Sequence, residues 1–429
     1  MESLFSYEWM IALMVIFGYG GIVFEHVSKI HKTAVALLLA VSCWSVYFLY
    51  SDTPFSSSLR ILEEHLAQTS QIVFFLIGAM TIVETIDAHH GFNSIARYIH
   101  SCSRVHMLWV ISLSTFFLSA ILDNLTTTIA MVSILRKLID SKEDRWLLGS
   151  MVVIAANTGG AWTPIGDITT TMLWINGNLS AVAVIRELFI PCIISLSASI
   201  LCYQWLFIKE DKELTTQDLK FDDQENSLLM FILGASLLIF VPAFKSITHL
   251  PPYMGMLISL AILWIFTDIL YFKDEKKHSN LGVQAIIHRI DLPSALFFAG
   301  ILLSVAAMDS AGILDWLAHF VNRHLVNETI IATSIGLLSS IVDNVPIVAT
   351  SMGMYDLGDY PKDSSFWQLI AYCSGTGGSI LIIGSAAGIA LMGLEKVDFF
   401  WYFRKISFPA IVGYFSGIAA YLLQNMIFG

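Results

Sequence analysis

The sequence has little charge for its length. Asp, Glu, Lys and Arg make up only 13% of its 429 residues, whereas 56% are hydrophobic, and the mean hydropathy is +0.71. A soluble globular protein carries about 25% charged residues. The composition therefore excludes a soluble protein and predicts an all-α polytopic membrane protein in a lipid bilayer. The formal net charge of −11 argues against nucleic acid as a partner.

Motifs for catalysis and for metal centres are also missing. The five Cys form no Cys-x-x-Cys pair, no Cys/His cluster has zinc spacing, and neither His-Glu-x-x-His nor Gly-x-Ser-x-Gly occurs. We therefore expect no enzyme and no cofactor. The first residues include Glu2 and Glu8 but no Lys or Arg. We expect the first apolar run to be a retained span, because a signal peptide begins with a basic region.

Long apolar runs are abundant. About 20 apolar residues cross the hydrocarbon core as a helix. Two runs, 146–175 and 366–394, are too long for a simple span and contain Gly-rich segments, so we expect each helix to be unwound in its middle. The sequence predicts about ten full spans, at 9–27, 33–50, 69–87, 146–175, 182–207, 228–248, 253–272, 293–310, 366–394 and 401–428.

Two further apolar stretches, 108–135 and 330–356, contain the pairs Asp123-Asn124 and Asp343-Asn344. A charged side chain costs roughly 2.5–3.5 kcal/mol at the centre of an inserted helix, so an intramembrane Asp points to function. Each stretch is either one long span or a re-entrant hairpin of two half-helices. Repeated apolar segments interrupted by Gly are a sequence sign of a transporter's binding site.

The placement of Lys and Arg favours the hairpins. If both hairpins enter and leave on one side and the N-terminus lies outside, 18 of the 23 basic residues fall in cytoplasmic loops. A full crossing by 108–135 would put Arg104 and Arg136 on opposite sides. With hairpins, the two units approach from opposite faces, as in an inverted repeat, and both termini lie outside. The predicted cytoplasmic loops are 28–32, 88–107, 136–145, 208–227, 273–292 and 395–405.

Similar residues recur at matching positions along the two halves. Phe74-Phe75 before Asp87 resembles Phe297-Phe298 before Asp309, Ser119 corresponds to Ser339, and Gly166 to Gly384. We expect a short interfacial amphipathic helix at 51–68. The predicted organisation is N-terminal scaffold helices at 1–68, a first inverted repeat at 69–207, linking helices and cytoplasmic loops at 208–292, and a second inverted repeat at 293–429.

The first repeat carries the ligand types of a small cation. Asp123 supplies a carboxylate and Asn124 supplies an amide oxygen. The Gly and Pro residues of 157–167 unwind the helix, which leaves backbone carbonyls available as ligands. Burial and a nearby like charge both favour a protonated carboxylate, so Asp123 and Asp167 could each hold a proton or a cation. Alternatively, each Asp only caps the helix that follows it.

The second repeat is chemically different. Pro346 stands where Thr126 stood, and Ser385 where Asp167 stood, which leaves Ser374, Thr376, Ser379 and Ser385 as neutral ligands. We therefore expect a proton and a cation to exchange at Asp123 and Asp167, with Asp343 in a supporting role. The pair His89-His90, after the span that ends near Asp87, is most simply a solvated helix end, with pH sensing as the alternative.

Residues 87–92, 115–128 and 153–174 closely resemble the NhaD-type sodium/proton antiporters of the ion transporter superfamily. The resemblance implies paired hairpins, unwound helices, a homodimer, elevator-like alternating access and a bacterial cytoplasmic (inner) membrane. It implies functional roles for Asp123, Asn124, Asn157, Asp167, Thr169, Thr170, Ser339 and Asn344. Thr158 departs from the Ala expected in many members.

The leading hypothesis is thus an antiporter of Na⁺, and of Li⁺, against H⁺. The alternative is a sodium-coupled carboxylate or oxyanion (arsenite-type) transporter, which two hairpin tips carrying Asp disfavour because they would repel an anion. The predicted Na⁺ ligands are Asp123, Asn124, Asn157 and Asp167. The full predicted set of cation- and proton-binding residues is Asp123, Asn124, Thr126, Thr127, Asn157, Thr158, Asp167, Thr169, Thr170, Ser339, Asp343, Asn344, Thr376 and Ser385.

Overall fold

The computed structural model describes residues 7–23, 29–91, 103–207, 226–272, 280–324 and 327–428, which are all-helical with connecting turns. The helices are α1 (Tyr7–Val23), α3 (Lys32–Tyr50), α4 (Phe55–Ala88), α6 (Arg104–Ser119), α7 (Asn124–Leu138), α8 (Lys142–Ala161), α9 (Ile168–Asn176), α10 (Ala181–Phe207), α11 (Ser227–Thr248), α12 (Pro252–Leu270), α14 (Val283–Ile286), α15 (Leu292–Ser310), α16 (Ile313–His324), α17 (Glu328–Leu338), α18 (Asn344–Met354), α19 (Ser365–Gly377), α20 (Ala386–Glu395), α21 (Phe399–Lys405) and α22 (Ser407–Phe428).

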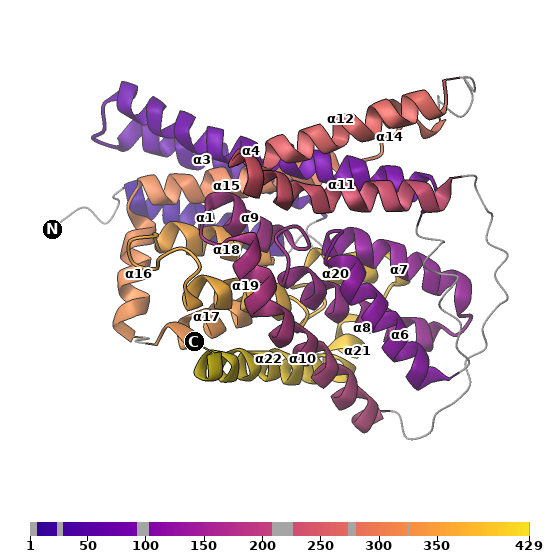
Figure 1. Cartoon of the computed structure of the whole chain (residues 1–429). Helices are drawn as coiled ribbons and strands as arrows, with labels where there is room; N and C mark the ends of the chain where they lie inside the picture. The colour runs from indigo at the N-terminus through magenta and orange to yellow at the C-terminus, as the bar shows by residue number, and fades with distance from the viewer. Residues whose placement is uncertain are drawn as a thin grey trace.

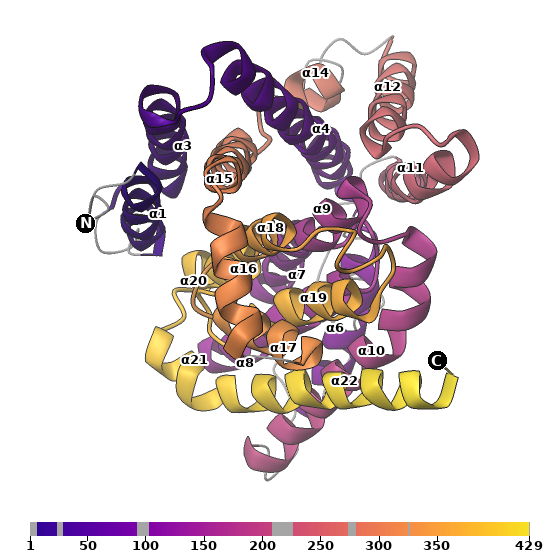
Figure 2. The ribbon, with the colours of Figure 1, turned by 90° about the vertical axis from the view of Figure 1, so that its left-hand side faces the viewer.

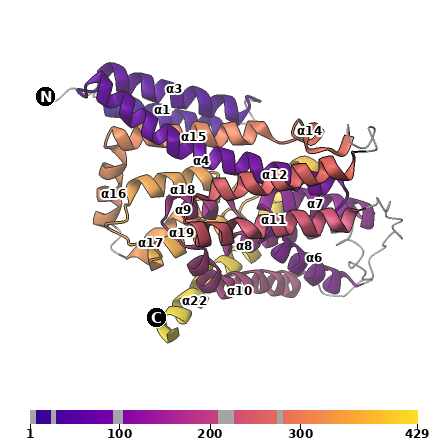
Figure 3. The ribbon, with the colours of Figure 1, turned by 45° about the horizontal axis from the view of Figure 1, so that its top comes forward.

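One layer of the molecule, which we call the scaffold layer, consists of α1, α3, α4, α11, α12, α14 and α15 (Figures 1 and 2). Its two halves meet where α4 packs against α15 on one side and against α11 and α12 on the other (Figure 3). Helices α3 and α15 approach each other closely at Gly300, where a Cβ atom would lie 2.7 Å from the Ala36 carbonyl carbon. This contact allows only glycine, so α3 and α15 form a tight pair.

The remaining helices, α6–α10 and α17–α22, form a second body that we call the core bundle (Figure 2). Helices α10 and α22 pack together along its edge away from the scaffold layer (Figure 1). The two bodies touch mainly where α18 lies on α15 and where α9 lies on α4. Helix α16 connects α15 to α17 at one end of the molecule.

Seven helices among the described residues are long and apolar enough to cross a membrane: α3, α4, α10, α11, α12, α15 and α22. Helix α1 is a shorter apolar helix in the first predicted span. The two longest apolar runs are interrupted, as predicted. α8 ends at Ala161 and α9 begins at Ile168, while α19 ends at Gly377 and α20 begins at Ala386.

Each Asp-Asn pair lies at a turn between two helices. α6 ends at Ser119 and α7 begins at Asn124, whereas α17 ends at Leu338 and α18 begins at Asn344. Both turns are held by equivalent hydrogen bonds to a broken helix. The Ser119 hydroxyl donates to the Ala156 carbonyl at 2.7 Å, and the Ser339 hydroxyl donates to the Ser374 carbonyl at 2.9 Å. The same local arrangement is therefore built twice.

Some predictions about the elements were wrong. The separate helix expected at 51–68 does not exist, because α4 runs from Phe55 to Ala88 without a break. Helix α16 was not predicted, and the last predicted span is divided at Ile406 between α21 and α22. Most of the predicted loops 88–107 and 208–227, and residues 273–279 of the predicted loop 273–292, lie outside the described residues.

Candidate cation site

The helix breaks of both halves converge on one buried group of polar side chains, the polar cluster. The Asn124 side-chain amide donates to Asn157 Oδ1 at 2.9 Å and to Asp167 Oδ2 at 3.1 Å. The Asn157 amide in turn donates to the Ser379 and Ser385 hydroxyls, each at 2.9 Å. No member is more than 3% exposed. The cluster thus joins α7, α8, the start of α9 and the broken segment before α20.

Asp167 has two roles in this cluster. It caps the N-terminus of α9, because its Oδ1 accepts from the Thr169 backbone N–H and hydroxyl, both at 2.9 Å. Its other oxygen, Oδ2, faces Asn124. Helix α19 passes close by, since a Cβ atom at Gly375 would lie 3.5 Å from Oδ2. The capping interpretation is therefore correct but covers only one of the two carboxylate oxygens.

Asp123, the carboxylate of the first Asp-Asn turn, is reached by a cavity. It caps α7 through the Thr126 N–H at 2.8 Å and accepts from the Thr126 hydroxyl at 2.6 Å. It also lines a cavity of about 270 Å³ between α4, α7 and the start of α15. Asp167 is not among the residues that line this cavity and is only 1% exposed. The adjoining Asn124 connects the two carboxylates, because it follows Asp123 directly and donates to Asp167.

Apart from Asp123, the charged residues of this cavity lie at one end of the scaffold layer. Glu84 and Asp87 belong to the last turn of α4, and Arg289 and Asp291 precede α15. A smaller cavity, of about 120 Å³, lies toward the other ends of the same two helices and is lined by His65 and Asp309, among others. Asp87 and Asp309, the two predicted repeat mates, therefore line different cavities.

Asp343 has a partner that the sequence did not reveal. It caps α18, and its Oδ2 lies 3.3 Å from Nζ of Lys32, the first residue of α3. Lys32 is the last residue of the predicted loop 28–32, and no sequence pattern connects it to Asp343. By contrast, the ion pairs among the described residues include none with Asp123 or Asp167. Asp123, Asp167 and Asp343 thus differ in their electrostatic partners.

The other predicted site residues divide into two groups. The Thr158 and Thr376 hydroxyls donate to carbonyls of their own helices, Ile154 and Tyr372, so they do not join the polar cluster. Thr170, likewise, contacts the Ala161 carbonyl at the end of α8. Thr127 and Asn344 are buried, and Thr127 Oγ1 and Asn344 Nδ2 have no hydrogen-bond partner in the described structure. The Thr127 hydroxyl is available to a cation or a water molecule, and the Asn344 amide N–H groups are available to a water molecule.

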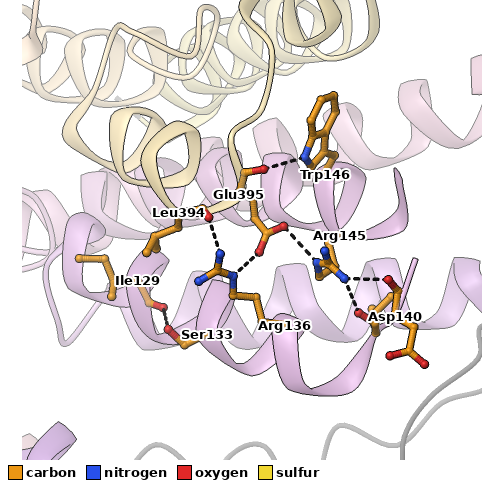
Figure 4. Close-up of polar contacts among 9 residues, drawn as sticks. Ile129, Ser133, Arg136, Asp140, Arg145, Trp146, Leu394 and Glu395 are labelled. Atoms are coloured by element: carbon orange, nitrogen blue, oxygen red, sulfur yellow. Dashed lines mark hydrogen bonds and ion pairs between the residues drawn. The ribbon is translucent and has the colours of Figure 1, made fainter. Parts of the chain in front are cut away.

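A second ionic group, the Glu395 clamp, holds α20 at the end opposite its cap Ser385 (Figure 4). The Glu395 carboxylate accepts from Arg136 Nε at 2.6 Å and from Arg145 Nε at 3.0 Å. The Trp146 indole N–H donates to the Glu395 carbonyl at 3.0 Å. Because Arg136 lies in the last turn of α7 and Arg145 in the first turn of α8, the clamp holds the end of α20 against the first half of the core bundle.

A many-helix membrane protein with a buried oxygen-rich cluster beside a cavity fits the class of secondary ion transporters. A family described as "Citrate transporter" matches residues 13–360. "Sodium/proton antiporter 1" of Arabidopsis thaliana is 50% identical over 97% of this chain and 73% of its own length, and "Sodium/proton antiporter 2" of the same plant is 49% identical over 96% and 98%. "Na(+)/H(+) antiporter NhaD" of Vibrio cholerae is 28% identical over 96% and 91%.

The chain belongs to the NhaD-type sodium/proton antiporter family, within the group of transporters that the citrate transporter match defines. This confirms the resemblance drawn from the sequence motifs. The relatives come from a plant as well as from bacteria. The bacterial cytoplasmic membrane therefore stays a prediction, and so do the positions of the termini and the homodimer.

Proposed function

We propose that this protein exchanges Na⁺, and also Li⁺, for H⁺ by competition between cation and proton at Asp123 and Asp167. The observation that carries the proposal is the polar cluster, in which a buried Asp167 faces Asn124 and no described basic residue forms an ion pair with it. A buried carboxylate without a counter-ion favours either a bound cation or a proton. Hard cations prefer such oxygen ligands. Sodium bound to the ionised Asp is expelled when the Asp takes up a proton.

The cavity at Asp123 suggests the path of the ions. Its charged end lies beside the predicted cytoplasmic loops 88–107 and 273–292, so we propose that it is a cytoplasmic vestibule. The turns at Asp123 and Asp343 would then be the tips of re-entrant hairpins in two inverted repeats. Alternating access would follow from an elevator-type displacement of the core bundle against the scaffold layer. The two bodies meet over few helices, which supports this division.

A carboxylate or oxyanion carrier is less favoured. Such a site needs donors and positive charge for an anion, but Asp123 and Asp167 would repel one at low dielectric. Lys32, a basic residue of the cavity lining, already pairs with Asp343. The curated names of the relatives also describe sodium/proton antiporters.

The test uses everted vesicles that contain the full chain and carry an imposed pH gradient, followed with a pH-sensitive dye. NaCl and LiCl should dissipate the gradient, in the absence of any organic anion, and the response should disappear in Asp123→Asn and Asp167→Asn. KCl and a sodium dicarboxylate serve as comparisons. Thr376→Val is the matched control, because the Thr376 hydroxyl bonds only within its own helix. A response that requires the dicarboxylate would overturn the antiporter proposal.

The hairpin has a separate test. Ser103 precedes α6 and Ser141 precedes α8, so single Cys residues there report on the two ends of the α6–α7 unit. A membrane-impermeant thiol reagent should label both from the cytoplasmic side. Labelling from opposite sides would mean that the unit crosses the membrane completely.

A further inference from the structure

The ion pair between Lys32 and Asp343 is largely shielded from solvent. The two side chains are only 17% and 9% exposed, and the ammonium also lies 4.5 Å from the centre of the Phe297 ring. Charges in such surroundings interact more strongly than at a surface, and the removal of one partner leaves the other uncompensated. Lys32 therefore acts on Asp343 as a cation that is already in place.

The two partners belong to different bodies. Lys32 is fixed to the scaffold layer, because the next residue, Thr33, donates to the Pro293 carbonyl at 2.9 Å and α3 adjoins α15 along Gly300. Asp343 caps the N-terminus of α18 in the core bundle, directly before the buried Asn344. The ion pair thus crosses the boundary between the scaffold layer and the core bundle.

The matching position in the first half is different. Asp123, the counterpart of Asp343, accepts hydrogen bonds from Thr126 and lines the cavity that Lys32 also lines. Within the described ranges, no ion pair holds Asp123. Of two equivalent carboxylates, one is thus compensated by a fixed ammonium, and the other can take a cation from the cavity.

We propose that Lys32 is a tethered counter-cation that closes the second Asp-Asn unit (Asp343, Asn344) to Na⁺ in the conformation described here. Only the unit around Asp123 and Asp167 then binds an exchangeable cation. This inference rests on the proposed function, since it concerns the same ions. Lys32 is a specificity-determining residue in this scheme, because it sets how many sodium ions the chain holds.

The position of Lys32 also makes its effect depend on conformation. If the core bundle shifts along the scaffold layer, Asp343 moves with α18 while Lys32 stays with α3. The ammonium and carboxylate then separate, and Asp343 requires another cation in the new state. The ion pair therefore favours the conformation in which the cavity reaches Asp123.

The experiment measures how many sodium ions bind to the purified full chain in nanodiscs, by equilibrium binding of radioactive Na⁺ at alkaline pH. Lys32→Met should bind one additional sodium ion per chain, because Asp343 loses its ammonium. Lys32→Met/Asp343→Asn should return to the wild-type number, and Lys32→Arg should equal the wild type. An unchanged number in folded Lys32→Met would overturn the inference.

The double variant keeps the test decisive if Lys32→Met does not fold. It contains no uncompensated charge at this position, and its sodium number should match that of the wild type. A lower number would show that Asp343 already binds Na⁺ in the wild type, against the inference. If the wild type itself neither binds nor exchanges Na⁺, the proposed function fails. If the wild type does both and Lys32→Met gains no sodium, only the role of Lys32 fails.

Discussion

The two Asp-Asn units have nearly the same backbone and very different chemistry. Asp123 and Asp343 each begin a helix at a turn, and each turn is held by a Ser hydroxyl bonded to a broken helix. Yet Asp123 lies on a cavity with Thr126, whereas Asp343 is paired with Lys32. The comparison teaches that the repeated fold supplies the geometry, and that a few side chains give the two copies different partners. In the proposed mechanism, those side chains decide which copy holds an exchangeable ion.

The broken helices show the same division. Asp167 caps α9 and contributes a carboxylate to the polar cluster, while the equivalent Ser385 caps α20 and contributes a hydroxyl to the same cluster. The second half therefore does not form a separate site of equal kind. It completes the first half's site with neutral ligands, through Ser379 and Ser385 on Asn157.

The largest effect on sodium/proton exchange should come from replacing the carboxylates of the first half with amides. Asp123→Asn and Asp167→Asn each remove a carboxylate on which both Na⁺ and H⁺ depend, and we expect exchange to fall by roughly 100-fold or more. Asp343→Asn should retain measurable exchange, because Asp343 is compensated by Lys32 in this conformation. Dye-monitored sodium/proton exchange in everted vesicles gives the comparison. Equal losses in all three variants would remove the proposed difference between the units.

The next largest effect should be on protein stability, through the Glu395 clamp that connects the two halves of the core bundle. Glu395→Ala leaves the Arg136 and Arg145 guanidiniums without their buried carboxylate, which should lower stability by about 3 kcal/mol. The measurement is thermal unfolding of the purified protein in detergent. Glu64→Ala is the control, because the Arg60–Glu64 pair is exposed and should contribute less than about 1 kcal/mol. Similar shifts for both variants would mean that the Glu395 clamp contributes little.

A smaller effect should follow from Ser385→Ala. Asn157 loses one of its two hydroxyl partners and α20 loses its cap, so we expect a loss of about 1 kcal/mol, or roughly 5-fold in apparent Na⁺ affinity. Thr158→Val is the matched control, because that hydroxyl bonds to its own helix. A larger loss in Thr158→Val than in Ser385→Ala would restore Thr158 to the site.

The smallest expected effect is on the pH dependence of stability, and it concerns His89 at the end of α4. The two repeats differ at this position as well. His89 is buried, stacked 5.7 Å from the Tyr271 ring, and its surroundings lower its pKa, chiefly because burial disfavours the charged ring. The histidine is thus not the solvated helix end that the sequence favoured. Its repeat counterpart after Asp309 is Ala311, which cannot titrate.

The sign of the pH effect follows from that lowered pKa. The unfolded chain takes up a proton at the ordinary pKa of about 6.5, before folded His89 does. Its contribution to stability should be complete above about pH 6.5 and decline as the pH falls toward the pKa of folded His89. Thermal unfolding between pH 8 and pH 5 should show a smaller acid-induced loss in His89→Gln than in His90→Asn. The same loss in both would assign the effect to other groups.

The helix breaks, the Asp-Asn turns and much of the polar cluster could be predicted from charged and helix-breaking residues within apolar runs. Asp123, Asp167 and the Gly-rich segments stand out because charge and broken helices are costly there. From these costs, the positions of both helix breaks and of the Asp-Asn turns could be predicted. The membership of the polar cluster was also largely predictable, because Asn124, Asn157 and Asp167 lie at these breaks.

The failures have physical reasons. Lys32 and Asp343 are far apart in sequence, and no local pattern predicts which scaffold helix approaches α18. Thr158 and Thr376 looked like ligands, but a Thr within a helix can satisfy its hydroxyl on the preceding turn. Residues 51–68 seemed a separate element because Arg60, Glu63 and Glu64 are charged. The helix tolerates these residues because Arg60 and Glu64 are largely exposed.

The length of α4 has a consequence for the membrane itself. Its 34 residues extend roughly 50 Å, whereas the hydrocarbon core is about 30 Å thick. The helix must therefore lean or project from the lipid, and its last turn carries Glu84 and Asp87 on the cavity. Hydrophobic mismatch would change that inclination as acyl chains lengthen or shorten. Lipid chain length thus becomes a variable that can alter how readily ions enter the proposed vestibule, without any change in the polar cluster.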